Sequence, residues 1–268
     1  MERPSWAPVG VDTDRPSVAR VYDFFLGGSH NFAVDREFGQ RVMETAPLTP
    51  RIMRANRAFL RRAVQFCVAA GVRQFIDIGS GIPTVGNVHE IAQRADPGAR
   101  VVYVDIDSVA VAHSQVILEG NPFATVVQGD ARQPEQVLAH PETRRLIDPQ
   151  QPVAVLLVAL LHFLSDDAEV DAMLRTVKEM LVPGSYLVIS HGSLEGQPPE
   201  AREVVQMYSR SAVPLVHRTR AQIEAFFDGL ELVEPGVVHV PVWRPDTRDE
   251  TTEHPERYIS YGGVGRKP

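Results

Sequence analysis

From Val72 onward, short runs of β-branched and apolar residues alternate with longer stretches of helical periodicity. The runs are nearly continuous in apolar character, which is typical of strands that are buried on both faces. They cover Phe75–Ile78, Val101–Val104, Ala124–Val127, Val153–Val158 and Tyr186–Ile189. Strands that alternate with helices predict a parallel sheet with right-handed crossovers, so this pattern places the chain in the α/β class.

Helical patterns fill the intervals between these runs. The expected helices are Val85–Arg94, Val109–Leu118, Pro134–Leu146 with a break at His140-Pro141, and Asp166–Leu181. After Ser190 the sequence predicts two further helices, Pro199–Met207 and Ala221–Phe227. A strand region follows over Leu230–Val242, with a bend at Pro235-Gly236, and a terminal strand is expected within Tyr258–Val264.

The first 71 residues differ from the rest because they predict helices only. Ser17 is placed to cap a helix that ends at Gly27-Gly28, since side-chain oxygens cap helix N-termini and glycine ends helices. Further helices are expected over Val34–Glu44 and from Thr49 to Gly71. No linker composition separates this part from the alternating part. We therefore expect residues 1–71 to form a helical extension, or lid, on one compact α/β unit of residues 72–268.

Composition excludes several classes of function. The net charge of -7 provides no general basic field for nucleic-acid binding, and the single cysteine, Cys67, excludes disulfide scaffolds and cysteine-based zinc clusters. The longest apolar run, Pro152–Leu164, is shorter than the roughly 20 residues that span a bilayer. Met1–Asp14 lacks the basic and apolar regions of a signal peptide. We expect a cytoplasmic enzyme or binding protein with no nucleic-acid or membrane partner.

A glycine turn follows the first predicted strand, in Phe75-Ile76-Asp77-Ile78-Gly79-Ser80-Gly81. Such a turn lets a ligand approach the backbone, and a helix opening after it would offer free N–H groups. The dinucleotide fingerprint fails here because its third glycine is replaced by Thr84. Asp77 would repel a pyrophosphate and attract a cation. The turn therefore favours a cationic ligand such as S-adenosylmethionine, with an ordinary strand–helix turn as the alternative.

Carboxylates also follow the second and third predicted strands. Asp105 can accept hydrogen bonds from ribose hydroxyls, and the neighbouring Ile106 can lie on the face of an adenine. Asp130, beside Ala131, can accept from the adenine amino group. Each aspartate taken alone is more commonly a helix cap or a loop carboxylate. Their joint placement at three successive strand ends, together with Asp77, indicates one nucleoside site.

Two residues are candidates for a direct role in chemistry. His162, after the fourth predicted strand, can act as a general base because a free histidine has a pKa of about 6.5, although a structural histidine fits the sequence equally well. Tyr22 precedes the Gly27-Gly28 break, a suitable hinge for a lid, and its alternative role is core packing. Methyl transfer from a sulfonium can also proceed by positioning alone.

Charged residues outside these strand ends suggest two weaker sites. Arg51, Arg54, Arg57 and Arg61 recur at helical spacing and predict one basic stripe, which is either a solvated face or a site for an anionic group of an acceptor. Asp105 with Asp107 is a carboxylate pair without a nearby histidine, so we predict no metal site.

The chain resembles a class I S-adenosylmethionine-dependent methyltransferase over roughly Val72–Val264. Within that class it closely resembles the S-adenosyl methyltransferase family, which was first catalogued as a domain of unknown function and is common in actinobacteria. The segments that carry the resemblance are Ala19–Gly28, Asn31-Phe32, Asp35-Arg36, Asp77–Thr84, Val101–Asp105 and Gly262–Pro268.

The resemblance implies a Rossmann-like, seven-stranded, mostly parallel sheet whose last strand is antiparallel. It implies that the cofactor binds at the carboxyl ends of strands one to four. By position, the methionine part faces Asp77, Gly79, Ser80 and Gly81, the ribose faces Asp105, and the adenine faces Asp130 and Ala131.

The leading hypothesis is S-adenosylmethionine-dependent methyl transfer to a small-molecule acceptor. A cofactor-binding regulatory protein that transfers nothing is the first alternative. An NAD-dependent oxidoreductase is the weaker alternative, because its cofactor also binds at a strand–turn–helix.

Overall fold

The computed structural model describes residues 12–83, 86–197, 200–209, 215–247 and 250–268. The strands are β1 (Gln74–Ile78), β2 (Arg100–Asp105), β3 (Ala124–Gln128), β4 (Ala154–Val158), β5 (Tyr186–Gly192), β6 (Glu231–Leu232), β7 (Val238–His239) and β8 (Ser260–Arg266). The helices of the first half are α1 (Val18–Phe25), α2 (Ala33–Thr45), α3 (Thr49–Ala69), α4 (Val88–Ala95), α5 (Ser108–Ile117), α6 (Pro134–Ala139) and α7 (Pro141–Leu146). The later helices are α8 (Asp167–Met180), α9 (Glu200–Ser209), α10 (Arg220–Ala225) and α11 (Glu250–Glu253), and single 3-10 turns lie at Leu161–Phe163, Val240–Val242 and Pro255–Arg257.

The strands form one sheet in the order β3-β2-β1-β4-β5-β8-β6, with β7 paired to β8. Strands β1 to β5 are parallel, whereas β8 runs antiparallel to β5. The predicted α/β class and mostly parallel sheet with an antiparallel last strand are confirmed, and the two-residue strands β6 and β7 raise the number of strands in the described residues from seven to eight. The strand order reverses between β1 and β4, and ligands bind at such a switch point in open α/β sheets.

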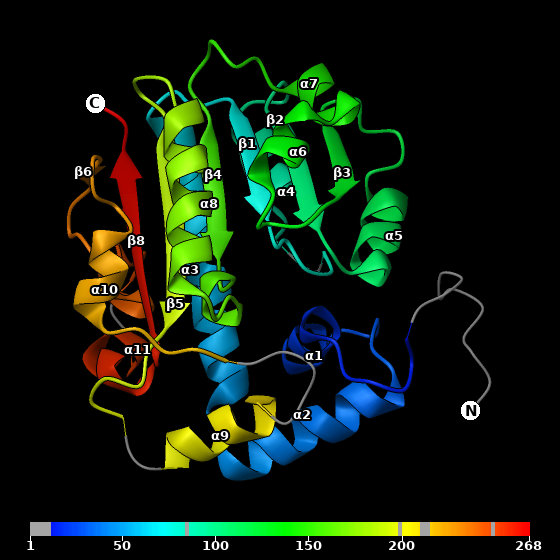
Figure 1. The fold of residues 1–268 in the computed structure, drawn as a ribbon, viewed down its shortest axis with the longest axis vertical. Coiled ribbons are helices and arrows are strands. Elements are labelled where there is room, and N and C mark those ends of the chain that lie inside the picture. The colour runs from blue at the N-terminus through cyan, green and yellow to red at the C-terminus, as the bar shows by residue number, and fades with distance from the viewer. Residues whose placement is uncertain (1–11, 84–85, 198–199, 210–214, 248–249) are drawn as a thin grey trace.

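Each face of the sheet is covered by helices because successive side chains of a strand point to opposite faces. In β1, Ile76 and Ile78 pack with residues of α6, α7, α8 and α10, whereas Phe75 packs with residues of α3 and α4. Figure 1 shows α8 in front of the sheet and α3 behind it. A sheet buried on both faces explains why its strands read as continuous apolar runs.

The three helices before β1 pack against different parts of the molecule. Phe59, Leu60 and Val64 of α3 share a hydrophobic core with the sheet. In contrast, α1 and α2 form a separate small cluster with α9, and Figure 1 places these three helices beyond the ends toward which β1 to β5 point. The division of the chain at residue 71 stays a prediction, and the packing of α3 associates that helix with the sheet.

A glycine pair ends α1, as the sequence predicts. A Cβ atom at Gly28 would lie 1.9 Å from the Asp23 Oδ1 atom, so only glycine leaves room for this carboxylate to fold back over the helix end. Asp23 accepts hydrogen bonds from the backbone N–H of His30 and from Nδ2 of Asn31, at 2.9 and 2.8 Å. The segment after the break is therefore an ordered loop that is held by Asp23.

The expected elements agree closely with the structure. Pro141 divides the predicted helix of residues 134–146 into α6 and α7, since proline cannot donate to the preceding turn. The expected helix starts at Val85 and Pro199 lie outside the described residues. Among the helices that the structure describes, none combines the length and apolar character needed to cross a membrane.

Candidate functional site

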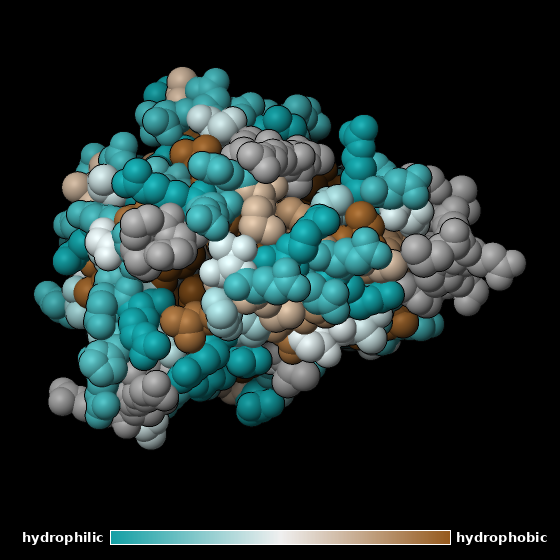
Figure 2. All heavy atoms as spheres, turned by 90° about the horizontal axis from the view of Figure 1, so that it is seen from below, coloured by the Kyte–Doolittle hydropathy of each residue, from teal (hydrophilic) through white to brown (hydrophobic). Residues whose placement is uncertain are grey.

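A cavity of about 890 Å³ lies at the carboxyl ends of β1 to β5, between the sheet and helices α1, α3 and α9. All ten candidate residues line it: Tyr22, Asp77, Gly79, Ser80, Gly81, Asp105, Ile106, Asp130, Ala131 and His162. Figure 2 views the molecule from the end covered by α2 and α9 and shows hydrophobic residues in recesses between hydrophilic ones. The ten candidates therefore share one cavity, and their individual roles follow from their contacts.

The glycine turn after β1 is tied to the neighbouring strand β2. The backbone N–H groups of Gly79 and Ser80 both donate to the carbonyl of Val104, at 2.8 and 3.1 Å, and that of Gly81 donates to Oδ2 of Asp105 at 2.7 Å. The expectation of free N–H groups at the opening of a helix is wrong, because these amides are engaged and α4 begins only at Val88. A turn without available donors suits a cationic ligand better than a phosphate.

Gly79 needs both its conformation and its missing side chain. Its φ of +72° lies in the left-handed region, and a Cβ atom would stand 2.6 Å from Cδ1 of Leu160. Gly81 has a φ of +67° but open space around it. The turn thus brings backbone close to the β4 end of the cavity, where a side chain at position 79 would intrude.

Asp77 is a buried carboxylate that faces the cavity, with 4% of its surface exposed. Burial raises its pKa to about 7, while the positive charge of Arg57 opposes this shift and the negative charge of Asp105 adds to it. Asp77 has no hydrogen-bond or ion-pair partner among the described residues, although buried carboxylates normally have one. A cationic ligand group would supply the missing partner.

Arg57 lines the same cavity from α3, with its guanidinium carbon 5.9 Å from the centre of the Tyr22 ring. The predicted basic stripe is not a single face, because Arg51, Arg54 and Arg61 line a second hollow of about 400 Å³. Arg61 there pairs with Asp246. Sequence reasoning missed that Arg57 belongs to the main cavity, although the arginine spacing had drawn attention to it.

Asp105 ends β2 and is 7% exposed. Its two carboxylate oxygens accept from the backbone N–H groups of Gly81 and Asp107, at 2.7 and 2.8 Å. Burial raises its pKa to about 6, and these two hydrogen bonds counteract that rise. Each oxygen can accept a second hydrogen bond, so the carboxylate can still bind a ribose diol. The next side chain, Ile106, is 62% exposed and offers apolar surface.

Asp130 lies at the far side of the cavity, after β3. Its carboxylate accepts from the backbone N–H of Arg132 at 2.9 Å and from the guanidinium of the same residue, which lowers the pKa of Asp130. The negative charge is therefore held in place beside Ala131. Its remaining acceptor capacity is available to an amino group.

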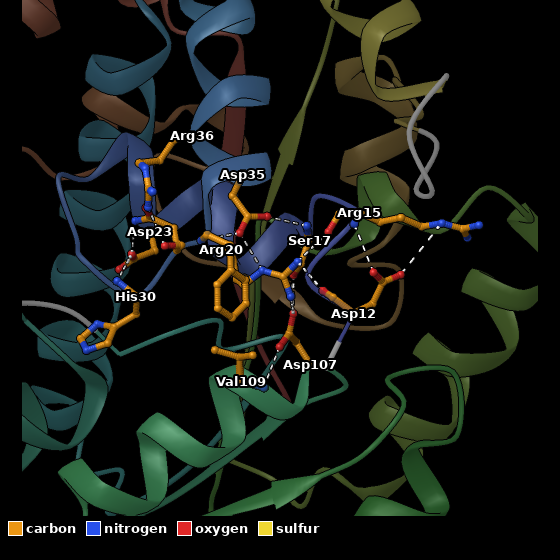
Figure 3. A network of polar contacts seen from close by, with 12 residues as sticks. Asp12, Arg15, Ser17, Arg20, Asp23, His30, Asp35, Arg36, Asp107 and Val109 are labelled. Atoms are coloured by element: carbon orange, nitrogen blue, oxygen red, sulfur yellow. Dashed lines mark hydrogen bonds and ion pairs between the residues drawn. The ribbon is translucent and has the colours of Figure 1, made fainter. Parts of the chain in front are cut away.

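Asp107 connects this site to the N-terminal helix, as Figure 3 shows. Its carboxylate caps α5 by accepting from the N–H of Val109 at 2.7 Å, and it also accepts from the Ser17 hydroxyl. The prediction that Ser17 caps α1 is wrong in this respect, because the hydroxyl is directed to Asp107. Arg20 lies between Asp107, at 3.7 Å, and the buried Asp35, at 2.8 Å. Helix α1 is thus anchored to the loop that follows β2.

Across the described residues, no group of three or more histidine, cysteine, aspartate or glutamate side chains is arranged to hold a metal ion. The hydrogen bonds of Asp105 and Asp107 described above explain how this carboxylate pair is used instead.

His162 lies in the 3-10 turn after β4 and is 8% exposed. Its Nδ1 accepts from the N–H of Gly192 at 3.2 Å, so a neutral ring carries its proton on Nε2. Burial and the nearby His191, His217 and Arg218 lower the pKa of His162 well below its ordinary value. With this tautomer the ring can donate a hydrogen bond from Nε2, which disfavours the general-base role.

Tyr22 has both its hydroxyl functions engaged by α3. The hydroxyl donates to the carbonyl of Met53 at 3.3 Å and accepts from Nδ2 of Asn56 at 3.1 Å. Burial raises the pKa of Tyr22. These contacts favour a role in packing α1 against α3, with the ring forming part of the cavity wall.

Several solved structures are similar to this chain. A presumed methyltransferase from Thermobifida fusca is 38% identical, with a TM-score of 0.92 over 98% of this chain and 99% of that one. A DUF574 family protein from Streptomyces avermitilis is 41% identical, with a TM-score of 0.90 over 96% and 99% of the two chains. An S-adenosylmethionine-dependent methyltransferase from Methanosarcina mazei, at 14% identity and a TM-score of 0.51 over 73% and 92%, shows likeness of fold alone. A comparison with curated proteins found no match.

The fold and the carboxylates at successive strand ends define a class I S-adenosylmethionine-dependent methyltransferase. The chain belongs to the S-adenosyl methyltransferase family, whose sequence pattern matches residues 4–268. Its cofactor is S-adenosylmethionine, and the buried Asp77 beside the Gly79 turn fits that cation. Membership of this family decides against the NAD-dependent alternative.

Proposed function

We propose that the protein transfers a methyl group from S-adenosylmethionine to a small-molecule acceptor held in the 890 Å³ cavity. The observation that carries this proposal is the convergence of Asp77, Asp105 and Asp130, from the ends of β1, β2 and β3, on that one cavity. Its volume lies within the range of about 300–1,000 Å³ that is common for small-molecule sites.

The methionine part of the cofactor is a zwitterion, and two residues of the cavity wall that interact electrostatically, Asp77 and Arg57, carry charges of opposite sign to match it. Asp77 would bind the ammonium group, which gives this buried carboxylate the partner it lacks among the described residues. Arg57 lines the same region and would bind the carboxylate. The amino-acid part would therefore bind in one orientation, because the reverse orientation would place its carboxylate beside Asp77 and its ammonium beside Arg57.

The nucleoside part would follow the strand order outward. Asp105 would accept from the ribose hydroxyls, Ile106 would cover one face of the adenine, and Asp130 with Ala131 would bind its amino edge. The order β3-β2-β1 then corresponds to adenine, ribose and methionine along one line. This line leads the sulfonium toward the β4 end of the cavity.

When bound, the cofactor supplies a methyl group that is already activated on a sulfonium sulfur. The chain then has to exclude water and hold the acceptor in line with that carbon, which is the main source of rate in such a displacement. Leu160 and His162 at the end of β4 lie in the corresponding part of the cavity wall.

Helices α1 and α2 act as the lid in this proposal. Ser17 and Arg20 connect α1 to Asp107, two residues after the ribose-binding Asp105. Ordering of the Asp105–Asp107 loop by the cofactor would therefore also order the lid. The single buried cysteine, Cys67, is in keeping with the reducing conditions of the cytoplasm, where we place the enzyme.

Calorimetry with S-adenosylhomocysteine tests the site directly. Wild-type protein should bind it with one-to-one stoichiometry, and Asp105→Ala should weaken binding because the ribose hydroxyls lose their acceptor. Asp246→Ala, on the second hollow, is the control that should bind normally. The absence of binding by folded wild-type protein would reject the proposed cofactor site.

A further inference from the structure

The cavity has a second half that the proposed cofactor position does not use. The cofactor lies over β3, β2 and β1, whereas the other half is formed at the ends of β4 and β5 and the start of β8. Its lining includes His162, Phe163, Gly192, Tyr208, His217 and Ser260. Among the described residues of β4, β5, β8, α9 and the segment before α10 that line this half, none carries a formal charge. Glu169, from α8, also lines the cavity but interacts with Arg132 on the adenine side.

Three histidines meet around Gly192, and two of them are committed to the fold. His191 pairs through Nδ1 with the Gly192 carbonyl at 2.6 Å and through Nε2 with Arg218 at 3.0 Å. His162 accepts from the Gly192 N–H through Nδ1. These contacts hold the end of β5 in place.

His217 differs from these two histidines in its hydrogen bonding. Both of its ring nitrogens are buried, and neither makes a hydrogen bond of regular geometry within the described part of the chain, although the Gly192 backbone lies close enough to raise its pKa slightly. Its Cε1 atom lies 3.9 Å from the position that a Cβ of Gly192 would occupy, and Nδ1 of His162 lies at the same distance from that position. The absence of a side chain at Gly192 therefore leaves open space between the two imidazoles.

The protonation state of His217 follows from its surroundings. Burial lowers the pKa of His217 to about 4, and the nearby Gly192 carbonyl, which already accepts from His191, only partly opposes this. At neutral pH the ring is uncharged, with one donor and one acceptor nitrogen. A buried polar group without partners is costly to the fold, so its retention in a cavity wall points to a ligand that satisfies it.

We propose that His217 hydrogen-bonds a hydroxyl group of the methyl acceptor, and that the acceptor is an uncharged molecule with an apolar body. The apolar body would pack against Phe163 and Tyr208, whose ring centres lie 6.3 Å apart. A charged acceptor in this half would find no countercharge on the described lining residues of β4, β5, β8, α9 and the segment before α10, which is strongly unfavourable. The assignment of the acceptor half rests on the cofactor position proposed above.

The test uses three probes on protein saturated with S-adenosylhomocysteine. They are 4-methylphenol, toluene, which lacks the hydroxyl, and 4-hydroxybenzoate, which adds a charge. By ligand-observed NMR titration, 4-methylphenol should bind about fivefold or more tightly than toluene, as expected for one buried hydrogen bond. The charged probe should bind more weakly than 4-methylphenol. This comparison on wild-type protein requires no variant to fold.

His217→Phe should abolish the preference for 4-methylphenol over toluene, and His217→Leu provides a second variant of smaller volume. His254→Phe is the matched control, since His254 is exposed and lies outside the cavity lining. All variants should bind S-adenosylhomocysteine within about twofold of wild type, which separates this proposal from the cofactor site.

Equal binding of 4-methylphenol and toluene, or no detectable binding of either, would overturn the proposal. So would a preference that survives in a folded His217→Phe or His217→Leu variant, or tighter binding of 4-hydroxybenzoate. Loss of S-adenosylhomocysteine binding by wild-type protein would instead refute the proposed function itself.

Discussion

Replacement of Arg57 by methionine should weaken cofactor binding only for ligands that carry the amino-acid carboxylate. Arg57 lies in the wall of the main cavity, close enough for its charge to lower the pKa of Asp77. If the guanidinium binds the carboxylate of the methionine part, methionine at this position keeps the length and apolar contacts of the side chain but removes the charge and the donors.

The magnitude follows from the burial of the site. A hydrogen bond to a charged group is worth about 1.5–3 kcal/mol in proteins. That range corresponds to roughly 10- to 150-fold in the dissociation constant of S-adenosylhomocysteine at 25 °C. The upper part of the range is expected here, because the neighbouring carboxylate Asp77 is only 4% exposed and water screens the pair little.

Calorimetry with two ligands isolates the effect. S-Adenosylhomocysteine carries both charges of the amino acid, whereas its decarboxylated analogue keeps only the ammonium. Arg57→Met should weaken the first ligand and leave the second within about twofold of wild type. Asp77→Asn should weaken both ligands, since both carry the ammonium.

Arg54→Met is the matched control. Arg54 lies on the same helix, is exposed and lines the second hollow, so the same substitution there should change neither affinity. An equal loss of affinity for both ligands in Arg57→Met would show that Arg57 supports the fold of the cavity and does not contact the carboxylate. Unchanged affinity for S-adenosylhomocysteine would refute the reasoning altogether.

Two further predictions concern protonation and backbone geometry. Because burial raises the pKa of Asp77 to about 7 and a bound ammonium favours the ionised carboxylate, S-adenosylhomocysteine affinity should rise with pH through about 7 with release of a proton. Calorimetry in two buffers of different ionisation enthalpy measures that release, which should diminish in Asp77→Asn. In the free protein, the contribution of Asp77 to the free energy of unfolding should fall as the pH rises from about 4 to about 7, because the folded state binds the extra proton in this range. Gly81→Ala should cost about 1–2 kcal/mol of unfolding free energy for its positive φ, and Gly79→Ala about 1–3 kcal/mol more because its Cβ meets Leu160. Urea denaturation measures both, and equal losses in the two variants would contradict the proposed clash.

The strands were predictable because the signal that defines them is local. A strand buried on both faces must be apolar at nearly every position, and Ala154–Val158 or Tyr186–Ile189 can be recognised without knowledge of their neighbours. The strand ends then locate Asp77 and Asp105 at one edge of the sheet, since parallel strands share a carboxyl edge. The two-residue strands β6 and β7 lie within the predicted strand region Leu230–Val242, on either side of its Pro235-Gly236 bend, but their short bounds could not be predicted because they form only by pairing with β8.

Hydrogen-bond partners were not predictable from local patterns. The hydroxyl of Ser17 has the sequence position of a helix cap, yet it donates to Asp107 because folding brings that carboxylate close. Likewise the amides of the glycine turn are taken by Val104 and Asp105 of the adjacent strand. Competition between local and distant partners is decided only when the chain is compact.

The sequence by itself determined the α/β class and the cavity-lining candidates. Only the tertiary structure decided which charges share the cavity, since Arg57 and Arg54 are three residues apart on one helix yet line different hollows. It also revealed His217, which no motif marked and whose two ring nitrogens lie buried in the cavity wall. The physical reason is that periodicity and strand ends are properties of the chain, whereas burial and the balance of partners are properties of the packed molecule.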